Sequence, residues 1–189
     1  MRRLSVLAVS LFVLGSVSAQ KMSGSLAPLK GQKEVNVVID YSKMLVNGDP
    51  ESKYIASETK KKTEKEKAEW LAEWNEKLRS DAYSMLTNDL GKHLNKDLFA
   101  VGDFPSAEYT INIKVIEIST GMPMVQPSGV KAEVKIVKTG GKSPIATIEY
   151  KRASSKLSAN IPYFVTRIVM SFGKLGDDLA NAINKNMKK

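Results

Sequence analysis

Three glutamates, Glu117, Glu133 and Glu149, fall on three successive predicted strands, where they would approach one another across a sheet. Two carboxyl groups are enough for glycoside hydrolysis, in which one donates a proton and the other acts as base or nucleophile. Glu133, however, shares its strand face with Lys131 and Lys135, and cross-strand Lys–Glu pairs are ordinary surface stabilisers worth about 0.2–1 kcal/mol. No aromatic platform for a sugar ring accompanies these glutamates, so a carboxylate hydrolase is the least favoured function.

Other reactive residue types are sparse. Cysteine is absent from the 189 residues, which excludes disulfides, thiol nucleophiles and thiolate metal sites. His93 is the only histidine, and a metal site around it would need carboxylates for its remaining ligands. The Gly141-Lys142-Ser143 segment lacks the glycine that a phosphate-binding loop needs five positions earlier, where Ile136 stands in a predicted strand. We therefore expect no catalytic residue, no metal and no cofactor.

A candidate contact surface is the loop of residues 121–127, whose tip carries the apolar side chains of Met122, Met124 and Val125. Methionine side chains adapt to irregular partners, and an apolar loop tip is typical of a ligand or partner contact. The alternative is that these side chains pack beneath a neighbouring helix.

Two tryptophans, Trp70 and Trp74, lie four positions apart and offer a second contact surface. Trp74 shares a helical stripe with Leu71 and Leu78, which favours a place in the core. The sequence leaves two interpretations of Trp70 open: a buried ring, or a partially exposed ligand or partner contact.

Four strands must position these residues. Apolar residues alternate with polar ones in each predicted strand, which is typical of a sheet with one buried face. The alternation changes phase at Ile116, which predicts a β-bulge or a strand end buried on both faces. The predicted strands are residues 35–41, 109–118, 130–137 and 145–151.

Two long amphipathic helices complete the predicted fold. Apolar residues three or four apart predict one helix from Thr63, whose hydroxyl would form a capping box with Glu66, toward Leu94. The same spacing predicts a second helix from Ile161, with Asn160 as its N-cap, close to the C-terminus. The order strand-helix-strand-strand-strand-helix predicts an α+β two-layer sandwich, in which a mixed sheet of about four strands carries both helices on one face.

The first residues have the pattern of a signal peptide. Arg2 and Arg3 precede an apolar stretch, and small side chains precede Gln20. The apolar stretch is shorter than the roughly 20 residues that cross a bilayer, so we expect cleavage, no transmembrane span and a periplasmic or secreted protein. The predicted organisation is a signal peptide at 1–19, a flexible leader at 20–33 and a single α+β domain at 34–189.

The chain is basic. Of its 29 Lys and Arg residues, Arg2 and Arg3 lie in the signal peptide, which leaves 27 against 20 Asp and Glu and a net charge of +7. Outside the cytoplasm the available polyanions are lipid headgroups and acidic glycans, so we expect no nucleic-acid partner. Arginine, which suits bidentate phosphate recognition, is scarce, and a lysine excess also serves general solubility.

The layout resembles a group of uncharacterised bacterial envelope proteins. The resemblance rests on residues 109–118, the 130–150 hairpin with its Thr139-Gly140-Gly141-Lys142 turn, and the closing helix from Ile161. It is similar to the N-terminal domain of the Tol-system translocation protein and to the soluble domain of the curli secretion lipoprotein. Many such relatives are lipoproteins, whereas this chain has Gln20 in place of an acylated cysteine.

These observations predict a non-catalytic exported interaction or assembly module of the bacterial envelope. Its partner would be an envelope protein, bound through the sheet face, a strand edge or the 121–127 loop. The alternative is an anionic envelope ligand, a lipid or an acidic glycan, bound through the lysine excess. Oligomeric state is left open by the sequence.

Overall fold

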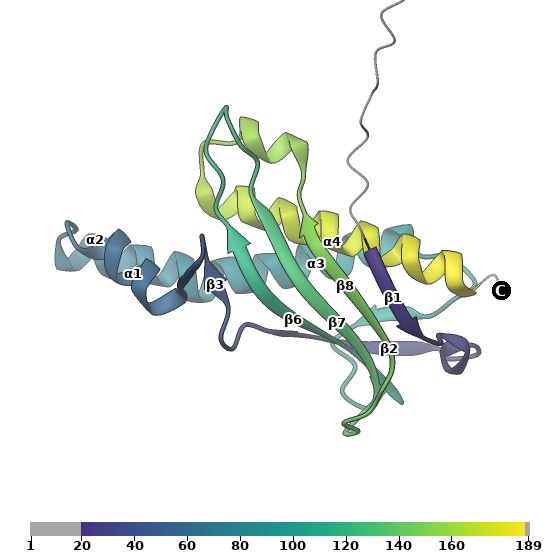
Figure 1. Ribbon diagram of the computed structural model, residues 1–189. Coiled ribbons are helices and arrows are strands. Elements are labelled where there is room, and N and C mark those ends of the chain that lie inside the picture. The colour runs from purple at the N-terminus through teal and green to yellow at the C-terminus, as the bar shows by residue number, and fades with distance from the viewer. Residues whose placement is uncertain (1–19, 188–189) are drawn as a thin grey trace, which may run out of the picture.

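The computed structural model describes residues 20–187, so the predicted signal peptide at 1–19 lies outside the described residues. Eight strands form one mixed sheet, with helices over one of its faces (Figure 1). The strands are β1 (Gln20–Gly24), β2 (Glu34–Asp40), β3 (Leu45–Val46), β4 (Asp49–Pro50), β5 (Ala100–Gly102), β6 (Tyr109–Ser119), β7 (Gly129–Lys138) and β8 (Pro144–Ala153). The helical segments are η1 (Ala27–Leu29), α1 (Glu51–Thr59), α2 (Glu64–Ala72), η2 (Glu73–Lys77), α3 (Leu78–His93), η3 (Lys156–Asn160) and α4 (Phe164–Met187).

The sheet has the order β1-β8-β7-β6-β2-β5, and the short β3 pairs with β4 and with β6. β2 runs parallel to β5 and β6, whereas β1, β8, β7 and β6 are antiparallel neighbours, so the α+β class and the mixed sheet are confirmed. The predicted number of about four strands is wrong. β3, β4 and β5 have only two or three residues each, which is too short for a hydrophobic alternation to reveal them.

The flexible leader predicted at 20–33 is also wrong. β1 adds an antiparallel edge strand to β8, with Met22 opposite Ile148, and Leu26 and Leu29 are buried in the core. The free edge of β8 needs hydrogen-bond partners for its main chain, and two leucines supply the apolar contact that an isolated edge lacks. The segment after residue 19 is therefore part of the folded body.

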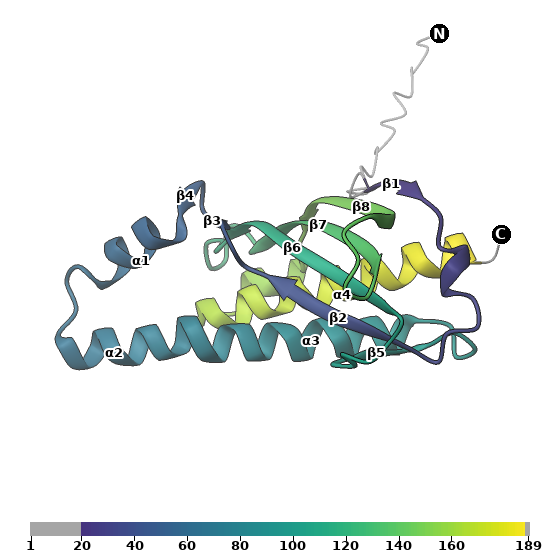
Figure 2. The ribbon, with the colours of Figure 1, turned by 90° about the horizontal axis from the view of Figure 1, so that it is seen from below.

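A long helical rod made of α2, η2 and α3 lies beside α4. It begins as predicted, because the Thr63 N–H donates to Glu66 Oε2 (2.8 Å) and the Glu66 N–H donates to Thr63 Oγ1 (3.4 Å). A π-helical turn, η2, interrupts it. The unpredicted α1 folds back alongside α2 beyond the end of the sheet (Figure 2). Sequence periodicity did not predict this helix because its sequence is mostly polar and too few apolar residues form a stripe.

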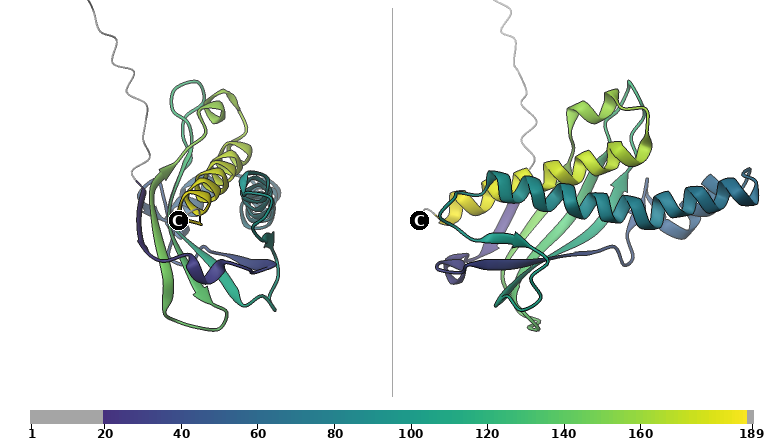
Figure 3. Two further views of the ribbon diagram at one scale, coloured as in Figure 1. Left: turned by 90° about the vertical axis from the view of Figure 1, so that its right-hand side faces the viewer. Right: turned by 180° about the vertical axis from the view of Figure 1, so that it is seen from behind.

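The fourth helix starts later than predicted. Residues 156–160 form the short 3₁₀ segment η3, and α4 begins at Phe164, so Asn160 does not cap it. α4 lies against the concave face of the sheet, with α3 on its far side (Figure 3). A Cβ atom on Gly176 would collide with the Leu86 carbonyl oxygen of α3 and lie 3.0 Å from the Leu90 nitrogen. Gly176 therefore allows two helices to approach closely.

Candidate functional site

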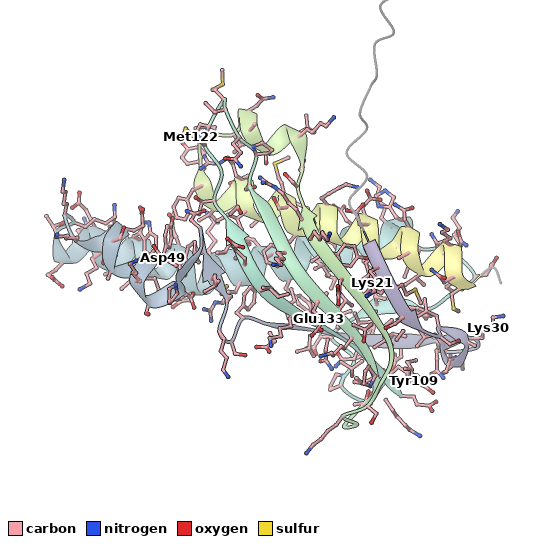
Figure 4. The ribbon with its side chains drawn as sticks, viewed as in Figure 1. Lys21, Lys30, Asp49, Tyr109, Met122 and Glu133 are labelled. Atoms are coloured by element: carbon pink, nitrogen blue, oxygen red, sulfur yellow. The ribbon has the colours of Figure 1, made fainter. Side chains whose placement is uncertain are left out.

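The exposed apolar side chains gather at one end of the molecule. Among residues 20–187, seven large hydrophobic side chains are exposed, and five of them come from the β6–β7 connection, from η3 and from the residue directly before α4. Met122 marks this end, beyond the ends of the strands (Figure 4). We call these five residues the apolar tip; their exposed fractions run from 58% to 83%, and they are Met122, Met124, Val125, Leu157 and Tyr163.

The loop that carries three of these side chains has a fixed backbone. The Met122 N–H donates to the Gln126 carbonyl (2.7 Å), and the Gln126 N–H returns a bond to the Met122 carbonyl (2.8 Å). The Met124 N–H donates to the Ala159 carbonyl of η3 (2.7 Å), which joins the two halves of the tip. Met124 has φ +62°, a left-handed conformation that is costly for a side chain of this kind.

A buried arginine supports the tip from below. The Arg167 side chain on α4 is buried, and its guanidinium donates to the carbonyls of Ile161 (3.0 Å) and Pro162 (2.7 Å), with a longer contact to Thr120 (3.4 Å). Thr120 lies in the β6–β7 connection, whereas Ile161 and Pro162 lie between η3 and α4, so the guanidinium joins the two parts of the chain that carry the tip. A buried charge is costly unless its N–H groups are hydrogen-bonded, so these bonds are strongly favoured. We therefore call Arg167 a clamp, because it holds the carbonyls of these backbone segments in place.

Serine hydroxyls tie the same segments together. The Ser128 hydroxyl, fully buried, bonds to the Arg167 carbonyl and to the Ser171 hydroxyl (2.8 Å), while the Ser128 N–H donates to Ser158 Oγ (3.2 Å). One buried network thus joins the start of β7 to η3 and α4. The apolar tip stands on a hydrogen-bonded base instead of on loose loops.

The predicted contact residues of the 121–127 loop are exposed, whereas Trp70 is buried. Met122, Met124 and Val125 are exposed, so they do not pack beneath a helix, and the bond from the Met124 N–H to the Ala159 carbonyl places their loop beside the segment that carries Leu157 and Tyr163. Trp70 is only 8% exposed. Its ring packs with those of Trp74 (centroids 5.5 Å apart) and Phe164 (5.9 Å), which themselves lie 6.3 Å apart, so Trp70 belongs to a buried aromatic cluster and is not a ligand contact.

The π-helical turn explains the burial of Trp70. A π turn contains one residue more than an α-helical turn. The side chains before it are therefore rotated by one position relative to α3, and Trp70 points where Leu71 would point in an unbroken α-helix. The stripe predicted from an unbroken helix contained Leu71 and Trp74. No residue pattern in the sequence marks the π turn, and Trp70 is therefore a core residue that sequence periodicity could not assign.

The three glutamates lie on the open face of the sheet. Glu133 pairs in register with Lys114 and Glu149, and its carboxylate forms a 2.8 Å ion pair with Lys135. Glu117 stands opposite Lys131, after the register shift that confirms the predicted bulge. A shallow hollow of about 420 Å³ lies over Glu133 and Glu149, but lysines flank both carboxylates. The arrangement lacks the apolar pocket that would keep one carboxyl protonated as a general acid.

The remaining candidates form no reactive cluster. His93 Nδ1 lies 3.0 Å from the Asp89 carbonyl and 3.5 Å from Asp177 Oδ1, which links α3 to α4. Over residues 20–187, no group of three His, Asp or Glu side chains is placed to hold a metal ion. Gly141 lies in the β7–β8 hairpin, where its N–H donates to the Lys138 carbonyl (2.7 Å).

No protein-family model matches this sequence, and no curated protein matches it. Among solved structures the chain is similar to a PelC dodecamer from Paraburkholderia phytofirmans, with 9% identity, a TM-score of 0.42, and coverage of 85% of this chain and 96% of that chain. A dodecamer of a PelC point variant from the same organism gives 14% identity, a TM-score of 0.38 and coverage of 83% and 95%. The resemblance to the Tol and curli proteins stays a prediction.

Several residues of the tip and its base escaped the sequence analysis. Leu157 and Tyr163 lie outside any periodic segment, in the stretch expected to be a connection and a helix start. Arg167 offered one signal, because it is the only charged residue between Ile161 and Phe172 in an otherwise uncharged helical stretch. Within residues 20–187, no helix has the length and apolar character needed to span a membrane.

Proposed function

We propose that this protein is a non-catalytic interaction module of the bacterial envelope that docks onto a partner protein through the apolar tip. The single observation that carries the proposal is the gathering of five of the seven exposed large hydrophobic side chains at one end. Clusters of this kind on a soluble surface are typical of interaction sites, whereas singly scattered exposed residues are not.

The construction of the tip supports a docking role. Burying one such side chain against a partner is worth about 1.5–3 kcal/mol. The clamp by Arg167 and the bond from Met124 to η3 hold the side chains in place before any partner arrives, so little conformational entropy is lost on binding. A tip built from long, adaptable Met and Leu side chains around one tyrosine also suits an irregular protein surface.

The compartment is part of the same proposal. It rests on the basic head, apolar stretch and small residues of positions 1–19, which have the pattern of a cleaved export signal. An apolar tip would be a liability in a crowded compartment unless a partner covers it. Export followed by docking accounts for both features.

A second candidate partner is an anionic lipid surface. Lys156 lies next to Leu157 in η3, the chain is basic, and Met, Leu and Tyr side chains also enter a lipid interface. The protein partner is favoured because Lys156 is the only lysine in the segments that carry the tip, residues 120–128 and 154–163, while the other exposed lysines lie elsewhere in the molecule.

Site-specific photo-crosslinking in cells tests the proposal. A photoreactive phenylalanine analogue replaces Val125 in one strain and Val38 in a control strain; Val38 is exposed on β2, away from the tip. We expect one discrete protein adduct from position 125 and none from position 38. Adducts with lipid alone, or equal adducts from both positions, would refute docking onto a protein. Loss of the adduct from position 125 after Leu157→Gln would assign the contact to the tip as a unit.

A further inference from the structure

The helical hairpin beside the tip forms a second surface. We call residues 51–72, which comprise α1, the connecting turn and α2, the arm; it extends beyond the sheet (Figures 1 and 2). Its base is fixed to the body, because Glu51 Oε1 accepts bonds from Trp74 Nε1 (2.7 Å) and from Arg79 Nη2 (3.0 Å). Tyr54 packs on the Trp74 ring with centroids 5.2 Å apart. The arm is therefore fixed to the body at its base.

A groove of about 460 Å³ lies along the arm. α1 lines it with Ile55 and Ala56, and the turn and α2 line it with Lys60, Lys62 and Lys67. Among the described residues, none of these three lysines forms a salt bridge. The groove thus combines apolar side chains with three lysines, of which Lys62 lies close enough to Glu66 that, after the Thr63 hydrogen bonds, its charge helps to lower the pKa of that carboxyl.

The acidic groups of the arm narrow the choice of ligand. Glu64 also lines the groove, and Glu66 is used by the capping box with Thr63. Both carboxylates lie in the first turn of α2, where they occupy the positive end of the helix dipole that a phosphate would need. The lysines offer point charges instead of the bidentate fork that suits phosphate. A compact phosphate therefore gains little here.

We propose that the groove binds an acidic amphipathic segment of a partner protein, with its apolar residues on Ile55 and Ala56 and its carboxylates at Lys60, Lys62 and Lys67. Apolar side chains in the groove require apolar groups from the ligand, which a hydrated acidic glycan does not offer. A short helix with apolar residues three or four apart between acidic ones supplies both. This surface is separate from the apolar tip and does not depend on it.

Peptide binding measured by fluorescence anisotropy tests the proposal. The probe is a labelled helical peptide of about 18 residues with leucines at helical spacing between glutamates, and its control has the leucines replaced by serine at the same charge. We expect the leucine peptide to bind the full mature chain about tenfold more tightly than the serine peptide. Binding of the leucine peptide should weaken by about tenfold between about 50 mM and about 300 mM salt.

Matched variants locate the binding. The triple variant Lys60→Glu, Lys62→Glu, Lys67→Glu should lose about tenfold in affinity. The control triple Lys30→Glu, Lys96→Glu, Lys142→Glu makes the same charge change at exposed lysines elsewhere and should lose less than about twofold. The two triples distinguish a local site from the general effect of net charge.

Further variants test whether the apolar part of the groove contributes to binding and whether the groove acts independently of the apolar tip. Ala56→Gln, at an exposed helix position, should weaken the leucine peptide about fivefold with no change of charge. Equal binding of both peptides, equal losses in the two triples, or stronger binding to phosphatidylglycerol vesicles than to the peptide would overturn the proposal. Met124→Asn in the apolar tip should leave peptide affinity unchanged, so failure here is distinguishable from failure of the docking tip.

Discussion

Replacing Met124 by asparagine should stabilise the protein while it weakens docking. Met124 is held at φ +62° by the bond from its N–H to Ala159, and a left-handed conformation costs an ordinary residue about 1–2 kcal/mol. Asparagine tolerates this conformation better, so Met124→Asn should recover about 0.5–1 kcal/mol of folding free energy. The side chain is 83% exposed, so its loss removes almost no packing in the free protein.

The same substitution should reduce affinity for the partner. Nearly all of the Met124 surface is still available for burial when the tip docks, and burying it is worth about 1.5–2 kcal/mol, which corresponds to about 10–30-fold in affinity. Urea denaturation measures the first effect, and the yield of the adduct from position 125 measures the second. Val38→Thr is the control and should change neither by much. A less stable Met124→Asn protein, or an unchanged adduct yield, would refute the reasoning.

Three further perturbations test the packing around the site. Gly176→Ala should cost about 2–3 kcal/mol in urea denaturation because its Cβ would meet main-chain atoms of α3, whereas Gly91→Ala, whose Cβ would lie 3.5 Å from a side-chain methyl, should be neutral or stabilising. Arg167→Met should cost about 2 kcal/mol and speed hydrogen exchange at residues 121–126, and unchanged exchange there would contradict its role as a clamp. Burial, aided by the charge of Glu58, raises the pKa of Tyr54 to about 12. Tyrosine in the unfolded chain ionises near pH 10, so the free energy of unfolding should fall as the pH rises from about 10 to about 12. In denaturation monitored by fluorescence, Tyr54→Phe should make this fall smaller.

Strong periodic patterns made the central elements predictable. β6, β7 and β8 alternate over ten or eleven residues, and of the two interpretations of the phase change at Ile116 the register shift supports the bulge. The capping box at Thr63 was predicted because it depends only on residues three positions apart. In each case the physical cause of the structure is local in sequence or repeats many times.

The missed elements depend on distant partners. β1 is a strand because β8 offers an edge 120 or more residues later, and nothing in its own five residues demands an extended chain. The apolar tip shows the same limit. Its loop residues were identified from composition, but Leu157 and Tyr163 join them only through the bond from Met124 to η3 and the turn into α4. Sequence patterns locate exposed apolar residues one segment at a time and do not assemble them.

The π-helical turn connects the arm to the tip. Because it directs Trp70 as well as Trp74 toward Phe164, three aromatic rings stack where the arm joins the body. Phe164 directly follows Tyr163 of the tip, so the same stack sets the position of the tip relative to the arm. In an unbroken α-helix Trp70 would point away from Phe164, and the junction would lack the indole ring of Trp70. A partner that touches both surfaces therefore meets them at a spacing fixed by packed rings, with no flexible segment to be ordered on binding.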